Sequence, residues 1–227
     1  MNKKTQVKRI FDTISYRYDL LNHLLSAGID FYWRKKALKL TGINPEASLL
    51  DIACGTGDFA IAAKKFNVTK IIGGDLSLNM LQLFNKKKDW SHGNTLQMIA
   101  EQIPIKNDRF TNITVAFGVR NFYDIKKGFE EFHRVLKQNG KVTILEFRLP
   151  ENKLLKNLYL FYFNKILPLI GRLISKDKEA YTYLPESVYE FDTKISLNNL
   201  LAETGFKNIK NHSLTFGIVQ VVIGEKP

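Results

Sequence analysis

Short apolar runs that alternate with helical segments dominate the middle of this 227-residue chain. Runs of this length between turn residues are typical of strands buried on both faces, and helices between them make neighbouring strands parallel. We expect these strands at residues 48–53, 70–74, 96–99, 113–117 and 141–147. The pattern predicts an α/β fold: a parallel sheet with helices on both faces and a ligand site beyond the carboxyl ends of the strands.

The end of the chain breaks this alternation. A predicted helix at 193–204 stops at Gly205, and two β-like runs, 206–212 and 216–223, follow with a three-residue connection. So short a connection fits a hairpin, because parallel neighbours need a long crossover. The sequence therefore predicts a mostly parallel, seven-stranded sheet that ends in a C-terminal antiparallel hairpin.

We predict a single domain, since neither an internal repeat nor a low-complexity linker interrupts the sequence. Apolar residues at spacings of three, four and seven indicate an amphipathic helix at 7–25. The expected parts of the domain 1–227 are an N-terminal helical cap at 1–45, a cofactor-binding core at 46–150, a helical lid at 151–192, and a terminal helix with the hairpin at 193–227.

The cysteine content and the net charge indicate in which cellular compartment the protein works and which class of partner it meets. One cysteine excludes an internal disulfide, which fits a reducing cytosol, and the basic N-terminus lacks the apolar core of a signal peptide. We therefore expect a cytoplasmic protein. The net charge of +12 favours a polyanionic neighbour, either nucleic acid or the anionic headgroups of a membrane.

The first expected strand runs into a glycine-rich loop, LLDIACGTGDF. Gly55, Gly57 and Ala60 fit the G-x-G-x-x-A pattern of a nucleotide-binding loop, and Asp75 follows at the distance of a ribose-binding carboxylate. A dinucleotide would place its pyrophosphate on the helix N-terminus, where Asp58 already stands. The loop therefore favours S-adenosyl-L-methionine, a cationic donor without phosphate, over a dinucleotide.

This ligand gives roles to the residues around the loop. Asp51 can pair with the ammonium group of the cofactor, and Asp75 can accept both ribose hydroxyls. Gly55 and Gly57 let the backbone approach the ligand closely. Cys54 is expected to pack as a small hydrophobic residue. We expect no metal, because the spacing of the four histidines suits none.

The chain resembles the C-methyltransferases of menaquinone and ubiquinone biosynthesis over nearly its whole length. The specific stretches are YDLLNHLLSAG, FGVRN and YTYLPES, whereas many methyltransferases share the glycine loop. The resemblance implies a Rossmann-like class I methyltransferase fold that binds S-adenosyl-L-methionine. It also implies methylation of a ring carbon of a prenylated quinol, either demethylmenaquinol, which we favour, or a polyprenyl methoxybenzoquinol.

Loop and resemblance together give the candidate cofactor residues. Ile99 departs from the family's pattern, which usually has Asn or Asp there, so the adenine contact is expected to fall to backbone groups or to Glu101. The full set of cofactor candidates is Asp51, Gly55, Thr56, Gly57, Asp75, Leu76, Ile99, Ala100 and Glu101.

The catalytic candidates are Arg120, Asn121, Tyr18 and Tyr183. Arg120 and Asn121 follow an expected strand, where a guanidinium could lower the pKa of a phenol and an amide could orient a water. The alternative is that Arg120 pairs with an acid such as Asp124 and holds the loop. Tyr18 and Tyr183, with Tyr181, could exchange hydrogen bonds with a quinol, although aromatic residues at helical spacing are more often core.

An apolar stretch at 154–175 raises the question of whether the chain contacts a membrane. Three basic residues and Pro168 argue against a spanning helix. A helix in the membrane interface or a lid over the substrate fits better, and a buried helical hairpin is the alternative. We expect peripheral contact with an anionic surface at the inner face of the plasma membrane and no nucleic acid; a homodimer is compatible with the resemblance.

Two rival functions stay open. Methylation of RNA amino groups commonly uses an Asn/Asp-Pro-Pro-aromatic loop, and the corresponding position here reads GVRNF, which disfavours an RNA methyltransferase. A non-catalytic module that keeps the cofactor fold is the second rival, and the substitution at Ile99 is the one feature that favours it.

Overall fold

The structure, a computed structural model, describes residues 3–166 and 178–227. Its centre is a seven-stranded sheet of order β3-β2-β1-β4-β5-β7-β6, with β7 antiparallel to both of its neighbours and the other pairs parallel. This confirms the predicted sheet and hairpin. The strands are β1 (Ser48–Ile52), β2 (Lys70–Asp75), β3 (Thr95–Gln97), β4 (Phe110–Ala116), β5 (Leu136–Phe147), β6 (Lys207–Leu214) and β7 (Val219–Glu225).

The strand register sets where the functional loops lie. Ile52 pairs with Gly74 on one side and with Val115 on the other. The glycine loop after β1, the end of β2 and the segment after β4 therefore meet at one edge of the sheet. This is the carboxyl edge at which α/β folds bind their ligands.

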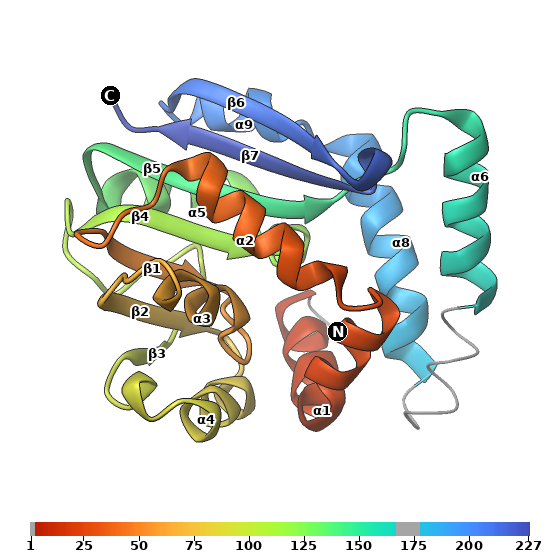
Figure 1. The fold of residues 1–227 in the computed structure, drawn as a ribbon, viewed down its shortest axis with the longest axis horizontal. Coiled ribbons are helices and arrows are strands. Elements are labelled where there is room, and N and C mark those ends of the chain that lie inside the picture. The colour runs from red at the N-terminus through yellow and green to blue at the C-terminus, as the bar shows by residue number, and fades with distance from the viewer. Residues whose placement is uncertain (1–2, 167–177) are drawn as a thin grey trace.

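Helices cover both faces of the sheet (Figure 1). On one face lie α2 (Ile29–Thr41), α3 (Asp58–Lys64) and α4 (Leu78–Lys87), and on the other lie α5 (Ile125–Val135) and α9 (Leu197–Glu203). Each set buries an apolar stripe against the strands. The largest fully buried side chains belong to these helices and to the residue just before β6: Phe84, Phe129, Phe132 and Phe206.

Three further helices stand beyond the carboxyl ends of the parallel strands (Figure 1). They are α1 (Lys3–Leu25), α6 (Lys153–Phe161), which continues as the π-helical turn η3 (Tyr162–Ile166), and α8 (Lys178–Lys194). A separate apolar cluster joins them through Ile10, Tyr159 and Val188. These helices form the cap over the carboxyl edge.

Short 3-10 helices complete the described chain: η1 (Asp89–Ser91), η2 (Val119–Asn121) and η4 (Thr215–Gly217). The predicted start of the terminal helix at residue 193 is wrong, because α8 runs to Lys194 and Ser196 then caps α9 by accepting a hydrogen bond from the Asn199 amide. Residues 167–175 of the apolar stretch lie outside the described residues. None of the helices described is both long and apolar enough to cross a membrane.

Candidate cofactor and substrate site

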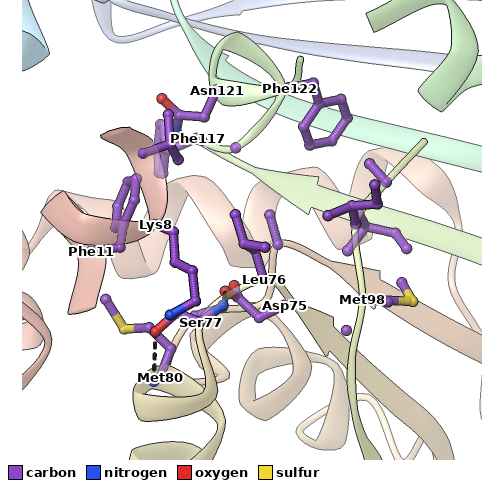
Figure 2. Close-up of a pocket in the computed structure, with 18 of the residues that line it drawn as sticks. Lys8, Phe11, Asp75, Leu76, Ser77, Met80, Met98, Phe117, Asn121 and Phe122 are labelled. Carbon is purple, nitrogen blue, oxygen red and sulfur yellow. Dashed lines mark hydrogen bonds between the residues drawn. The ribbon is translucent and has the colours of Figure 1, made fainter. Parts of the chain in front are cut away.

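A cavity of about 840 Å³, partly open to solvent, lies at the carboxyl edge of the sheet. In Figure 2 the floor carries Asp75 and Ser77, Lys8 and Phe11 enter from α1, and Asn121 lies on the opposite wall. The cavity therefore joins the glycine loop and the end of β2 to the segment after β4, as the sequence predicts.

Asp75 is anchored at the floor of the cavity. Its Oδ2 accepts a hydrogen bond from the Gly55 amide and its Oδ1 accepts one from the Ser77 amide, both at 2.8 Å. Burial raises the pKa of the Asp75 carboxyl, and these two amide bonds offset part of the effect. Each oxygen keeps a second lone pair for a ligand hydroxyl. The predicted ribose role thus agrees with the position of Asp75.

Asp51 lies below the glycine loop and is not among the residues that line the cavity. Its carboxylate accepts hydrogen bonds from the Ala60 amide at 3.1 Å and from the Thr114 hydroxyl at 2.7 Å. Only 1% of Asp51 is exposed, and burial raises its pKa to about 7. In this structure Asp51 supports the loop from beneath, so any effect on the predicted ammonium group acts through the field of its charge.

The other loop residues divide between lining and support. Gly55 lines the cavity at a φ of 55°, whereas Gly57 turns the chain into α3 at a φ of 86°. A Cβ on Gly57 would lie 2.2 Å from the ring of Phe84, so the position admits only glycine. Thr56 is buried and donates a hydrogen bond to Asp19 of α1, away from the cavity lining.

The predicted adenine wall forms one side of the cavity. Leu76, Ile99, Ala100 and Glu101 all line it. The Glu101 carboxylate, however, accepts hydrogen bonds from the amides of Tyr123 at 2.6 Å and Asp124 at 3.1 Å. Glu101 therefore braces the loop after η2 from the cavity wall.

Arg120 is paired, but with a different acid from the one proposed in the alternative. Its Nη1 donates to Glu146 at 2.7 Å and to the Phe117 carbonyl at 2.5 Å, while Nε donates to Ser187 of α8 at 3.3 Å. Asp124 instead caps α5. Both members of the Arg120–Glu146 pair are buried, and Arg120 is not a lining residue. The guanidinium thus ties the cap to the sheet directly behind the cavity wall.

Asn121 and Tyr183 come together at the wall. The Tyr183 hydroxyl donates to Asn121 Oδ1 at 2.8 Å, and Asn121 lines the cavity. Tyr18 lines it from α1, whereas the side chain of Tyr181 lies outside the described part of the chain. Burial raises the pKa of Tyr183, so its phenol keeps its proton. Two of the four catalytic candidates, Tyr18 and Asn121, therefore line the cavity, and Tyr183 and Arg120 each bond to a residue that lines it.

Sequence reasoning missed several contributors. Val7, Lys8 and Phe11 line the cavity because α1 crosses over it. Their helical spacing predicted an amphipathic helix, but nothing in it identified a ligand as the surface they face. Glu146 was also missed, since it lies inside an apolar strand run and its partner Arg120 lies in a separate segment, the 3-10 helix η2 after β4.

Comparison with known proteins identifies the class. The profile that describes the ubiE/COQ5 methyltransferase family matches residues 1–226. The chain belongs to the ubiE/COQ5 methyltransferase family. This confirms the expected resemblance, and with it a methyltransferase whose cofactor is S-adenosyl-L-methionine.

The alignments with relatives extend over nearly the whole chain. The ubiquinone/menaquinone biosynthesis C-methyltransferase UbiE of Geotalea daltonii is 46% identical, with 99% of this chain and 97% of the relative aligned. The demethylmenaquinone methyltransferase of Chlorobaculum tepidum is 41% identical, over 94% and 89%. A crystal structure of an S-adenosylmethionine-dependent methyltransferase from Thermotoga maritima shares the fold, with a TM-score of 0.68 at 20% identity over 96% and 99% of the two chains.

The cavity itself fits this cofactor. Among the lining residues that the structure describes, Lys8 is the single base, and it is paired with Asp12 at 2.6 Å. The floor carboxylate of Asp75 suits hydroxyl groups, and Asp58 occupies the helix N-terminus that a pyrophosphate would need. An acidic, apolar cavity of this kind suits a cationic nucleoside and repels a polyphosphate.

Proposed function

We propose that this chain methylates a ring carbon of demethylmenaquinol to form menaquinol. One observation carries the proposal: a single cavity joins the Asp75 floor to the wall at Asn121, which Tyr183 contacts, in a chain 41% identical to a demethylmenaquinone methyltransferase. A polyprenyl methoxybenzoquinol is the alternative substrate, because the names of other relatives include the ubiquinone pathway.

The reaction requires the protein to stabilise a phenolate. A quinol ring carbon becomes nucleophilic when the neighbouring phenol loses its proton to water. The methyl group would leave sulfur for that carbon, and the carbon would then release its own proton to water, so that the ring becomes aromatic again and the phenolate regains a proton from solvent. S-adenosyl-L-methionine supplies the methyl group when bound. The chain must hold the ring carbon about 3 Å from that methyl, which can contribute several kcal/mol.

Asn121 is proposed to bind the phenol oxygen, and Tyr183, which donates to Asn121 Oδ1, is proposed to orient its amide. Among the residues that the structure describes, the Asn121 Nδ2 makes only a long bond of 3.5 Å to the Phe117 carbonyl, so it can donate to a substrate oxygen or to an ordered water. The Arg120–Glu146 pair behind the wall fixes the loop that carries Asn121 and adds a preorganised dipole. Tyr18 and the apolar lining residues Phe117 and Phe122 can flank the ring and exclude water.

An anaerobic assay with both reduced quinones and labelled methyl donor tests the proposal. We expect label in the naphthoquinol, and we expect Tyr183→Phe to lower kcat about 10- to 100-fold because one oriented hydroxyl is lost. Tyr189→Phe on the same helix is the matched control, since Tyr189 is 51% exposed. Absence of label in both quinols would refute the function, and an unchanged kcat in Tyr183→Phe would remove Tyr183 from it.

We also propose that α6 contacts an anionic membrane surface, where a prenylated substrate resides. Leu154, Leu158 and Phe161 are 77%, 64% and 57% exposed, and their spacing of four and three places them on one face of α6. The opposite face packs through Tyr159 into the cap. Exposed Lys153 adds positive charge beside the stripe, which favours anionic headgroups.

Co-sedimentation with vesicles containing phosphatidylglycerol tests this contact. We expect wild type to pellet with anionic but not with neutral vesicles, and Leu158→Asp to release it. Leu78→Asp is the matched control, because Leu78 is 48% exposed on α4 at the other end of the sheet. Equal pelleting of wild type and Leu158→Asp would contradict the proposal. A wild-type dimer in solution that Leu158→Asp dissociates would also contradict it, because a second copy of the chain would then cover the exposed face of α6.

A further inference from the structure

The α1 helix is a wall of the cavity and also bonds to the rest of the site through polar side chains. It contributes Val7, Lys8, Phe11 and Tyr18 to the lining. Two of its carboxylates, seven residues apart and therefore on one face of the helix, bond to the core beneath. Asp12 accepts a hydrogen bond from the Ser77 hydroxyl, and Asp19 makes the second attachment.

The second attachment is a cluster of four side chains, here called the clasp: Asp19 of α1, Thr56 of the glycine loop, Asp58 of α3 and Lys87 of α4. Lys87 Nζ donates to Asp19 Oδ2 at 2.8 Å and to Asp58 Oδ1 at 2.5 Å, and lies 3.4 Å from the Thr56 hydroxyl. The Thr56 hydroxyl in turn donates to Asp19 Oδ1. One ammonium group thereby joins three separate elements.

The clasp is complete without a metal ion. Ligand atoms of Asp19, His23 and Asp58 lie within 4.8 Å of one another, a spacing that could hold a cation. The Lys87 ammonium already lies between the two carboxylates, and His23 Nδ1 lies 2.9 Å from Asp30. Burial would lower the pKa of Lys87, but the carboxylates of Asp58 and Asp19 outweigh it and raise the pKa, so the group stays charged at neutral pH.

The clasp lies next in the chain to a residue that lines the cavity, Tyr18. Tyr18 precedes Asp19 and lines the cavity, and its Cε1 would lie 3.7 Å from a Cβ placed on Gly55. Fixing Asp19 onto Thr56 and Lys87 therefore fixes the turn of α1 that lies over the glycine loop. The chain reverses just after α1, at Ala27 and Gly28, both with positive φ.

We propose that Lys87 and Asp19 are positioning residues that hold α1 closed over bound cofactor, so that the cofactor leaves only when this clasp opens. The inference rests on the cofactor site and not on which quinol is methylated. Neither residue lines the cavity, so their substitution changes cofactor retention without removing a ligand contact.

The test is the dissociation rate of S-adenosylhomocysteine, measured by stopped-flow displacement for Lys87→Met, Asp19→Asn and the double variant. We expect each single variant to dissociate about 10-fold faster than wild type, and the double variant to be no faster than the singles, because they break the same contact. Lys86→Met is the matched control, since Lys86 is the exposed neighbour on the same helix. It should leave the rate unchanged.

Hydrogen exchange of the cofactor-free chain supplies a second readout. Amides of α1 should exchange faster in Lys87→Met and Asp19→Asn than in wild type, while amides of β4 and β5 stay protected. If Lys87→Met fails to fold, Asp19→Asn still decides, because it leaves the Lys87–Asp58 pair intact. Wild-type dissociation rates in a folded Asp19→Asn, or additive rates in the double variant, would overturn the inference, whereas a failure to methylate quinols would not bear on it.

Discussion

The buried Asp51 carboxyl makes cofactor affinity depend on pH close to neutrality. Burial raises its pKa to about 7, and the hydrogen bonds from Thr114 and Ala60 offset only part of this. A cation bound in the cavity above favours the ionised carboxylate, so binding lowers the pKa of Asp51 and releases a proton. Affinity for S-adenosyl-L-methionine should therefore rise with pH and level off once Asp51 is ionised in the free protein.

The size of this effect follows from the pKa. A carboxyl with a pKa of about 7 is about nine-tenths protonated at pH 6 and about one-tenth protonated at pH 8. If bound cofactor keeps Asp51 ionised throughout, the apparent Kd falls about 10-fold between these pH values, and about half a proton leaves per cofactor bound at pH 7.

Calorimetry in two buffers of different ionisation enthalpy measures both quantities. Asp51→Asn should bind with a much flatter pH dependence and release fewer protons, because the group that titrates is gone. Asp108→Asn is the control, since Asp108 lies on the surface by Lys226 and far from the cavity lining. A wild-type Kd that is constant from pH 6 to pH 8, or an equal slope in Asp51→Asn, would refute this coupling.

Three further substitutions test single contacts. Gly57→Ala should destabilise the fold by about 2–4 kcal/mol, through backbone strain and overlap with Phe84. Gly93→Ala should cost only about 1 kcal/mol, because Gly93 has a similar φ but a Cβ there would meet nothing within 4 Å. Denaturant melts of the two variants measure both free energies of unfolding. Glu146→Gln should cost about 3–5 kcal/mol in the same melts, because it leaves the Arg120 charge buried without its carboxylate, whereas Glu190→Gln in an exposed pair should cost little. Burial raises the pKa of the Cys54 thiol, so mass spectrometry should find Cys54 alkylated by iodoacetamide only after unfolding; rapid labelling of the native chain would contradict the buried position.

How much the sequence predicts depends on how local each signal is. The strands of the core, the glycine loop and the position of Asp75 follow from apolar runs and turn residues that lie close together in the chain. Asn121 and Tyr183 could be named only separately, because their contact spans 62 positions. The clasp could not be predicted, since Lys87 is one of three consecutive lysines and only the packing of α1 and α4 singles it out.

The same limit explains the outcome for Arg120. Its place after an apolar run predicts the carboxyl edge of the sheet, which is correct. Its partner is Glu146, which the β4–β5 register brings to that edge, and no pattern within either segment indicates the pairing. Arg120 lies in η2 and Glu146 in β5, so their pairing depends on how the segment after β4 packs against β5, which is a property of the assembled fold.

The central claim is that a cationic sulfur donor, with its ribose on Asp75, occupies the carboxyl edge. Titration calorimetry of the chain with S-adenosylhomocysteine and with NAD tests it most directly. We predict binding of S-adenosylhomocysteine, at least about 10-fold weaker in Asp75→Ala because a charge-assisted hydrogen bond is lost, and no heat with NAD. Binding of NAD, or absence of S-adenosylhomocysteine binding by the folded wild type, would contradict the account.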